Sequence, residues 1–106
     1  MSTCSTHVLD SARGRPASGV FVTLSDAEGT QIGAATTDVG GRARFDPSLE
    51  PGIYELTFAT GPWFADQDRE TWYPVVTLAF TVAEGESHYH VALLLSPYAY
   101  TTYRGS

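Results

Sequence analysis

Short runs in which apolar and polar residues alternate, separated by turn residues, constrain this chain more than any other feature of its sequence. Residues 20–24 (VFVTL) place Val20, Val22 and Leu24 on one face of an extended strand. No segment has the sustained apolar period of about 3.6 residues that a helix facing a core would show. The chain is therefore predicted to be all-β, with about eight strands over residues 4–9, 20–24, 31–37, 42–45, 53–60, 74–82, 88–95 and 98–104.

Turn residues separate these segments. Residues 26–29 (DAEG) predict a hairpin between the second and third strands, and Gly40–Gly41 predicts another turn. Residues 46–52 allow at most one helical turn, and residues 61–73 are expected to form a longer loop. Strands so short and so closely spaced are typical of a β-sandwich or a small barrel.

Length and composition predict a single globular domain over residues 1–106. The 106 residues are 42% hydrophobic and 17% charged, which argues against disorder. One cysteine, Cys4, cannot form an intrachain disulfide, and no apolar run approaches the about 20 residues of a membrane helix. The first residues lack a basic segment followed by an apolar stretch, so a cytoplasmic location is expected.

The charge balance excludes two classes of partner. Twelve acidic residues face six basic ones, for a formal net charge of −6, and every base is an arginine. A nucleic-acid-binding domain carries an excess of positive charge that this chain lacks. An anionic membrane surface would repel it as well. We therefore expect neither nucleic acid nor membrane as a partner.

The strand predicted over residues 88–95 is apolar on both faces. Tyr89, Val91 and Leu93 lie on one face, while Ala92 and Leu94 lie on the other. In so small a domain, a strand buried on both sides needs a second subunit to cover one sheet. A homo-oligomer with closed symmetry is expected.

The three histidines are predicted to share the outer face of a sheet. His88 and His90 are two residues apart on one strand, so their side chains project from the same face about 7 Å apart. If Val8 points toward the core, His7 points away from it. A lone histidine on a strand is most often a hydrogen-bonded surface or interface residue, but three on one face favour a site.

Two kinds of chemistry remain open for such a site. A His-x-His pair with a third histidine is compatible with catalytic zinc, although no cysteine pair or His-Glu-x-x-His motif accompanies it. The metal-free alternative needs one neutral imidazole as a general base and a fixed cation for developing negative charge. His90 or His7 together with Arg42 would supply both. Cys4 has no activating neighbour and is interpreted as a small strand residue.

Both ends of the chain resemble one family of enzymes. The opening residues are CSTHVLDSARGRPASGVFVTL and the closing ones HYHVALLLSPYAYTTYRGS. Between them stand TTDVGGR, GIYELTF and WYPVVTLAF, in the same order. The chain resembles the 5-hydroxyisourate hydrolases, also called transthyretin-related or transthyretin-like proteins, over essentially its whole length.

This resemblance implies a fold, an assembly and a reaction. The fold would be a transthyretin-like (prealbumin-like) β-sandwich of two four-stranded antiparallel sheets with at most one short helix. The assembly would be a homotetramer, a dimer of dimers, with the site at the interface between dimers. The small-molecule substrate would be 5-hydroxyisourate, whose ring amide is hydrolysed to 2-oxo-4-hydroxy-4-carboxy-5-ureidoimidazoline in urate (purine) degradation. No cofactor and no metal would be required.

Matching the motifs residue by residue also implies site residues. His7, Arg42 and His90 would be catalytic, with His7 or His90 deprotonating the attacking water and Arg42 stabilising the oxyanion. His88 remains either a supporting residue or a bystander. The family usually has an acidic residue where Gly40 stands, so a looser turn before Arg42 is expected. The substrate-binding residues would be the terminal Tyr103, Arg104, Gly105 and Ser106.

A carrier of the same fold is the main alternative function. Vertebrate transthyretin has a segment similar to residues 94–100 (LLSPYAY) but binds hormone in a central channel. It lacks the Tyr-Arg-Gly-Ser ending and the histidine and arginine set. The presence of both in this chain favours the hydrolase over a small-ligand carrier without catalysis.

Overall fold

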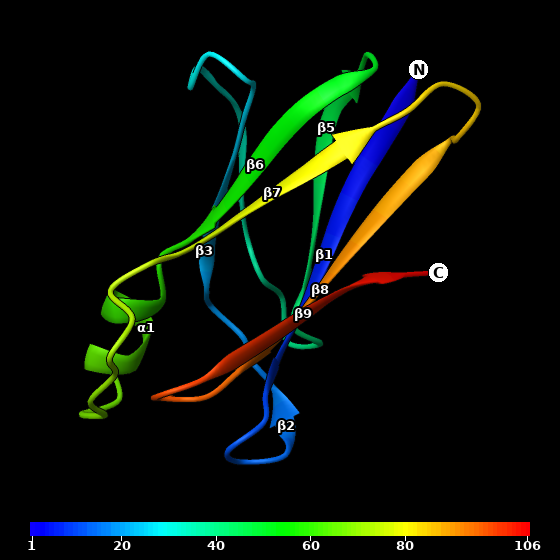
Figure 1. The fold of residues 1–106 in the computed structure, drawn as a ribbon. Helices are drawn as coiled ribbons and strands as arrows, with labels where there is room; N and C mark the ends of the chain where they lie inside the picture. Colours follow the sequence, from blue (N-terminus) through cyan, green and yellow to red (C-terminus); the bar gives the residue numbers. More distant parts are fainter.

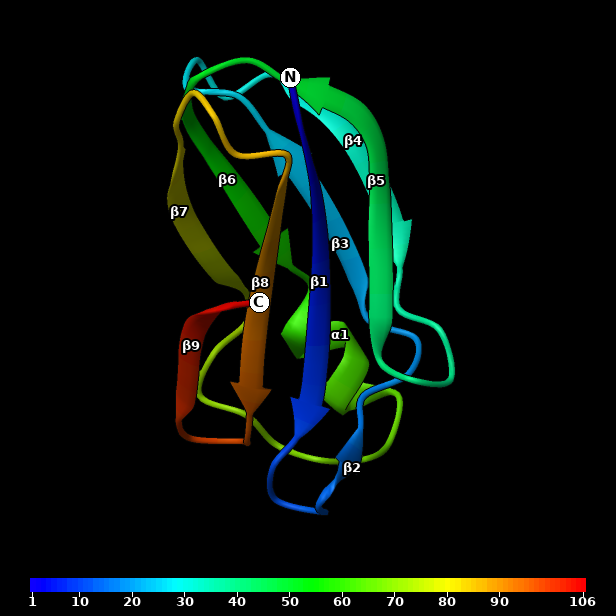
Figure 2. The same cartoon turned by 90° about the vertical axis from the view of Figure 1, so that its right-hand side faces the viewer.

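Two β-sheets face each other across the core, with one short helix at one end (Figures 1 and 2). A computed structural model describes residues 1–106. The fold class predicted from the sequence, a transthyretin-like β-sandwich, is confirmed. The elements are β1 (Ser2–Asp10), β2 (Arg15–Pro16), β3 (Phe21–Ser25), β4 (Gln31–Thr36), β5 (Arg42–Leu49), β6 (Gly52–Phe58), α1 (Thr60–Ala65), β7 (Val76–Val82), β8 (His88–Leu95) and β9 (Tyr100–Gly105).

The first sheet is built around β1 and β8, which run parallel. Their register extends from Thr3 opposite His88 to Asp10 opposite Leu95. β9 pairs antiparallel with β8, while β5 and the two-residue β2 pair antiparallel with β1. This sheet differs from the expected four antiparallel strands in two details, its fifth strand and its one parallel pair. The parallel pair is possible because the chain between β1 and β8 crosses to the other sheet and back.

The second sheet has the order β4-β3-β6-β7 and is antiparallel throughout. The hairpin predicted at residues 26–29 joins β3 to β4, and the Asp26 carboxylate accepts hydrogen bonds from the backbone of Glu28 and Thr30. β5 is longer than predicted and continues to Leu49, because this buried leucine pairs with Ser2 of β1. Part of the loop predicted over residues 61–73 is the six-residue helix α1.

The core lies between the sheets and is made of alternate residues from their strands. Val8 and Leu93 come from the first sheet and Val22 and Leu56 from the second, and all four are fully buried. Burying a side chain of this size stabilises the fold by about 1.5–3 kcal/mol relative to leaving it exposed. Cys4 is also buried, and its desolvation raises the pKa of its thiol to about 12. Its thiol therefore stays protonated, in agreement with its interpretation as a small strand residue.

Helix α1 is held to the sandwich by its buried face. Phe64 is fully buried, and the Thr60 hydroxyl donates a hydrogen bond to the carbonyl of Tyr73 at 2.9 Å. No helix in this structure is long and apolar enough to cross a membrane.

Candidate functional site

The outer face of the first sheet carries the histidines. Strand alternation turns Val8 and Tyr89 into the core, so their neighbours His7, His88 and His90 face outward, as the sequence predicts. Figure 2 looks onto this face, with β8 and β1 side by side and β5 and β9 flanking them. The face therefore brings together side chains from four strands.

His7, His90 and Arg42 meet on this face. The ring centroids of His7 and His90 are 6.4 Å apart, and the rings are tilted by 40°. Arg42 begins β5 directly opposite His7 of β1, so its side chain projects from the same face. The Nε2 atom of His7 is buried and has no hydrogen-bond partner within the chain. The three residues predicted to be catalytic are thus neighbours, although they are up to 83 positions apart in sequence.

A turn at residues 38–41 fixes the backbone of Arg42 at the beginning of β5. The Asp38 carboxylate accepts hydrogen bonds from the backbone N–H groups of Gly40 at 2.9 Å and Arg42 at 3.0 Å. The Arg42 N–H is the main reason that the pKa of Asp38 is lowered. Gly41 has a φ of +76°, and a Cβ there would lie 2.3 Å from the carbonyl oxygen of Val8. The expectation of a looser turn is wrong, because Asp38 supplies the carboxylate from two positions before Gly40.

A row of hydrogen-bonding groups runs beside His90. The Thr3 hydroxyl lies 2.6 Å from Nδ1 of His88, and the Ser5 hydroxyl lies 2.8 Å from Nε2 of the same ring. The Ser5 hydroxyl also lies 2.7 Å from Nδ1 of His90. The sequence reasoning missed Thr3 and Ser5, although their alternation with Cys4 on one strand places them on the face of His7. His88 is therefore linked to His90 through a shared hydroxyl.

The electrostatics of the face favour a neutral imidazole at His90. Its pKa is lowered below the ordinary value, first by burial, which penalises the charged ring. Positive charge at His7, His88 and Arg42 lowers this pKa further. A neutral imidazole at pH 7 has a free lone pair and can accept a proton from water.

The hydrogen bonds of His88 bear on the zinc alternative. Both of its ring nitrogens lie within hydrogen-bonding distance of a hydroxyl, from Thr3 and from Ser5. A zinc ligand needs a ring nitrogen free to coordinate the ion. No three His, Cys, Asp or Glu side chains are grouped as a metal site. His88 could therefore coordinate zinc only by giving up one of these two hydrogen bonds.

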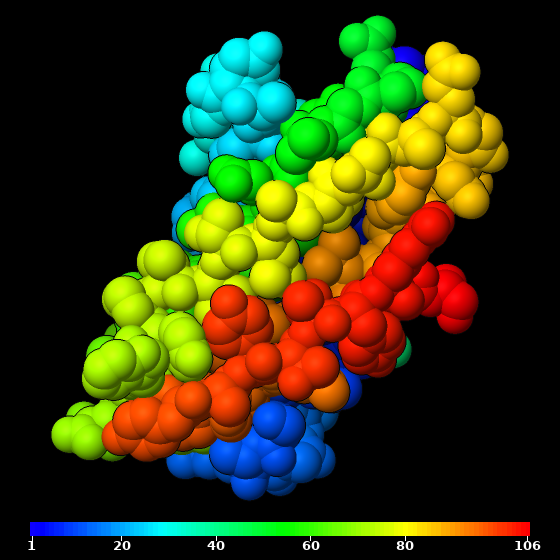
Figure 3. Space-filling view, in the orientation of Figure 1, coloured from blue at the N-terminus to red at the C-terminus, as the bar shows by residue number.

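The C-terminal strand brings only part of the predicted tetrapeptide to this face. Gly105 lies opposite His90, so close that a Cβ there would be 2.5 Å from Cδ2 of the imidazole. Tyr103 pairs with Ala92, projects from the same face and is exposed. Ser106 follows β9 and is also exposed. Figure 3 shows β9, in orange and red, lying along the surface of the molecule.

Arg104 lies on the opposite face of β9 from Tyr103. Its guanidinium carbon is 4.6 Å from the centroid of the Tyr89 ring, and its Nη2 is 3.5 Å from the Glu86 carboxylate. Tyr89 is buried in the core, and Glu86 lies in the loop between β7 and β8. Within one chain, therefore, Arg104 does not join His7 and His90.

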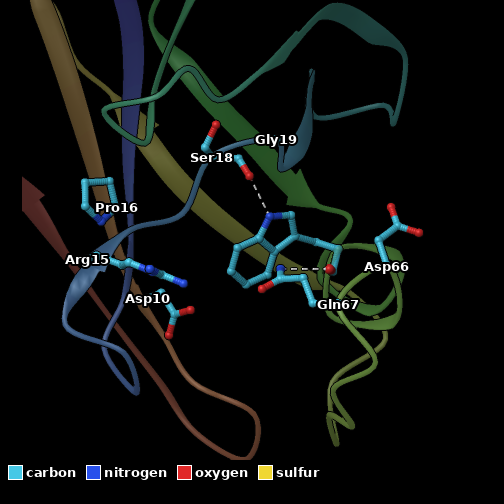
Figure 4. Close-up of a pocket in the computed structure, with 8 residues that line it drawn as sticks. Asp10, Arg15, Pro16, Ser18, Gly19, Asp66 and Gln67 are labelled. Atoms are coloured by element: carbon cyan, nitrogen blue, oxygen red, sulfur yellow. Dashed lines mark hydrogen bonds between the residues drawn. The ribbon is translucent and has the colours of Figure 1, made fainter.

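A separate groove of about 370 Å³ lies at another part of the molecule (Figure 4). Asp10 and Arg15 stand on one side of it, and Asp66 and Gln67 on the other. The indole N–H of Trp63 donates a hydrogen bond to the carbonyl of Ser18 at 2.7 Å. None of the residues predicted for the site lines this groove.

The fold and the outer-face cluster together define a transthyretin-like β-sandwich with paired histidines on one sheet. The model of the HIUase/Transthyretin family matches residues 4–105, and the chain belongs to this family. A 5-hydroxyisourate hydrolase of Caulobacter vibrioides is 43% identical over 115 aligned positions. The alignment covers all of this chain and all of that protein.

Two solved structures are similar to the whole fold. The 5-hydroxyisourate hydrolase of Klebsiella pneumoniae has a TM-score of 0.92 and 42% identity, with all of both chains covered. Sea bream transthyretin in complex with thyroxine has a TM-score of 0.89 and 32% identity, covering 96% of this chain and 93% of its own. The family thus contains both a hydrolase and a hormone-bound protein of this fold.

Proposed function

We propose that this protein is a 5-hydroxyisourate hydrolase that acts in urate degradation by metal-free activation of water. The observation that carries the proposal is the meeting of His7, His90 and Arg42 on one sheet face, where His90 is held neutral. The similarity to hydrolases of Caulobacter and Klebsiella over the full chain supports the same substrate.

The reaction is the hydrolysis of a cyclic amide. His90 takes a proton from water, and the oxygen of that water adds to the ring carbonyl carbon of 5-hydroxyisourate. The carbon–nitrogen bond of the amide then breaks, and His90 gives the proton that it took from water to the leaving nitrogen. The carbonyl carbon becomes a carboxylic acid, which loses its proton to solvent and is a carboxylate at neutral pH. The product is 2-oxo-4-hydroxy-4-carboxy-5-ureidoimidazoline. His7, whose ring centroid is 6.4 Å from that of His90, would orient the water or the substrate.

Arg42 has the chemistry to hold the negative oxygen that forms during attack. Its planar guanidinium stays charged and can make two parallel hydrogen bonds to oxygens. The terminal residues Tyr103 to Ser106 are proposed to bind the substrate as well. Because Arg104 faces away from His90 in its own chain, we propose that it reaches the substrate through a second subunit.

A homotetramer, a dimer of dimers, would complete this site. The outer face carries Ala92 and Leu94 of β8 on the same side as the imidazoles, and the exposed Tyr103 of β9 pairs with Ala92. A second dimer packed on this face would cover these apolar groups and exclude water from the site. Sedimentation analysis of the purified protein tests the assembly, and a monomer at assay concentration would contradict it.

The function is tested with freshly generated substrate. Urate oxidase converts urate to 5-hydroxyisourate in the cuvette, and its decay is followed by ultraviolet absorbance with and without the protein. Strong acceleration that survives dialysis against a chelator is expected. No acceleration by a folded tetramer would refute the hydrolase, and loss of activity on chelation would refute the metal-free mechanism.

A carrier without catalysis is the second candidate, and the likeness to thyroxine-bound transthyretin is the observation that favours it. The same protein sample separates the two. A carrier would bind thyroxine in a titration and leave the decay of 5-hydroxyisourate unchanged, whereas the proposed enzyme accelerates that decay.

A further inference from the structure

The Ser5 hydroxyl sits between two imidazoles and can serve only one of them as a donor. Its oxygen is 2.8 Å from Nε2 of His88 and 2.7 Å from Nδ1 of His90. Ser5 is 8% exposed, so water has little access to replace either contact. A hydroxyl carries one proton and two lone pairs, so Ser5 can donate to only one of the ring nitrogens and the other must donate to it.

The direction of these hydrogen bonds is set at the far end of the row. The Thr3 hydroxyl donates to the carbonyl of Ser87 at 3.4 Å and lies 2.6 Å from Nδ1 of His88. Both contacts can be hydrogen bonds only if the Thr3 proton goes to Ser87 and the Thr3 oxygen accepts from Nδ1–H of His88. A neutral ring that is protonated at Nδ1 has a lone pair at Nε2, so Nε2 of His88 accepts from Ser5.

This direction determines which nitrogen of His90 carries the proton. Since the Ser5 proton points to His88, the Ser5 oxygen accepts from Nδ1–H of His90. The neutral His90 ring is then unprotonated at Nε2. A general base needs this free lone pair, and the opposite tautomer would offer an N–H to the water instead.

We propose that Ser5 is a positioning residue that holds His90 in the tautomer protonated at Nδ1, with His88 and Thr3 setting the direction of the hydrogen bonds. The proposal rests on the proposed function only for its effect on turnover. The tautomer of His90 is a property of the protein by itself and is measured without substrate.

The tautomer is read by nuclear magnetic resonance. The chain has only three histidines, so protein labelled with ¹⁵N-histidine gives three ring patterns, assigned by replacing each histidine in turn. At a pH where His90 is neutral, its Nδ1 is expected to be protonated and its Nε2 unprotonated. In Ser5→Ala the two forms should both be populated. A proton on Nε2 of His90 in the unmodified protein would overturn the proposal, whether or not the protein hydrolyses 5-hydroxyisourate.

Kinetics supply the second readout. Ser5→Ala should lower kcat by about 10- to 100-fold, part of the about 10²- to 10⁴-fold contribution of a general base, with KM changed by about twofold or less. Ser5→Thr, which keeps a hydroxyl, should recover most of the rate. Thr77→Val, an exposed hydroxyl deletion on the other sheet, is the matched control. Unchanged kcat in a folded Ser5→Ala protein would overturn the proposal, and if that variant does not fold the spectrum of the unmodified protein decides.

Discussion

At the residue scale, the chemistry depends on an imidazole that stays neutral beside three positive or potentially positive neighbours. His90 is half-buried between β1 and β9, with Gly105 packed against its ring. Burial and the neighbouring charges both disfavour the imidazolium, so they act in the same direction on its pKa. A tetramer that covers the face would strengthen the effect of burial.

Removing either outward imidazole of the pair is expected to abolish most turnover. His90→Ala should lower kcat by about 10²- to 10⁴-fold, because it removes the proposed base, and His7→Ala should also remove most of it. The assay is the decay of 5-hydroxyisourate, with circular dichroism and sedimentation as controls for fold and assembly. Full activity in both variants would contradict the site.

The pH dependence of turnover should report the lowered pKa of His90. The charged or titratable groups that act on its ring are His7 from β1, His88 on the same strand and Arg42 from β5. From β9, the residue packed against the ring is Gly105, which has no side chain to titrate. Because the neutral ring is the active form, kcat/KM should fall only at acid pH, with a midpoint below the ordinary 6.5. The stability of the fold should change in the same direction. The neutral ring contributes stability above pH 6.5, and this contribution is lost as the pH falls from 6.5 through the lowered pKa of the folded state. A midpoint above 6.5 would contradict this assignment.

At the element scale, two turns with the same hydrogen-bond pattern allow the loss of a turn to be separated from the loss of a catalytic position. Asp38 and Asp26 each accept two backbone hydrogen bonds through one carboxylate oxygen, but only Asp38 accepts one from Arg42. Asp38→Ala should lower kcat/KM because the start of β5 loses its support and Arg42 loses its position. Asp26→Ala should lower the melting temperature to a similar degree and leave the kinetics unchanged. Equal kinetic losses in the two variants would refute a positioning role for Asp38.

At the scale of the whole molecule, a buried ion pair ties the segment after α1 to the end of β1. Arg69 Nη1 lies 2.8 Å from the Asp10 carboxylate, and its guanidinium carbon is 4.8 Å from the Phe64 ring centroid. Burial alone would raise the pKa of Asp10, but the hydrogen bonds from Arg69 and from the backbone of Arg13 outweigh it and the pKa is lowered. The pair therefore stabilises the protein above pH 3.8, and this contribution is lost as pH falls through the lowered pKa.

Breaking this pair should cost about 3 kcal/mol of unfolding free energy in Arg69→Met, because Asp10 is left buried without its partner. Chemical denaturation at neutral pH measures the loss. The double variant Asp10→Asn/Arg69→Met should recover part of it, since no buried charge remains. A single variant as stable as the unmodified protein would show that the ion pair does not stabilise the fold.

Much of the fold and of the site follows from patterns that are local in sequence. Alternation predicted that Val8 and Tyr89 point inward and that His7 and His90 point outward, because successive side chains on a strand face opposite sides. The same pattern places Arg104 opposite to Tyr103, but motif matching alone put all four terminal residues together. The family pattern has its acidic residue at the position of Gly40. In this chain the carboxylate comes from Asp38, two positions earlier, and accepts from the N–H groups of Gly40 and Arg42.

The sequence by itself determined the all-β class, the inward and outward faces of the strands, and the candidate residues His7, Arg42 and His90. Only the tertiary structure decided that β1 lies parallel to β8, and hence that Ser5 stands opposite His90. The physical reason is the separation in sequence over which each feature is decided. The facing of a side chain depends on its own strand, whereas a hydrogen bond between residues 85 positions apart depends on how the whole chain packs.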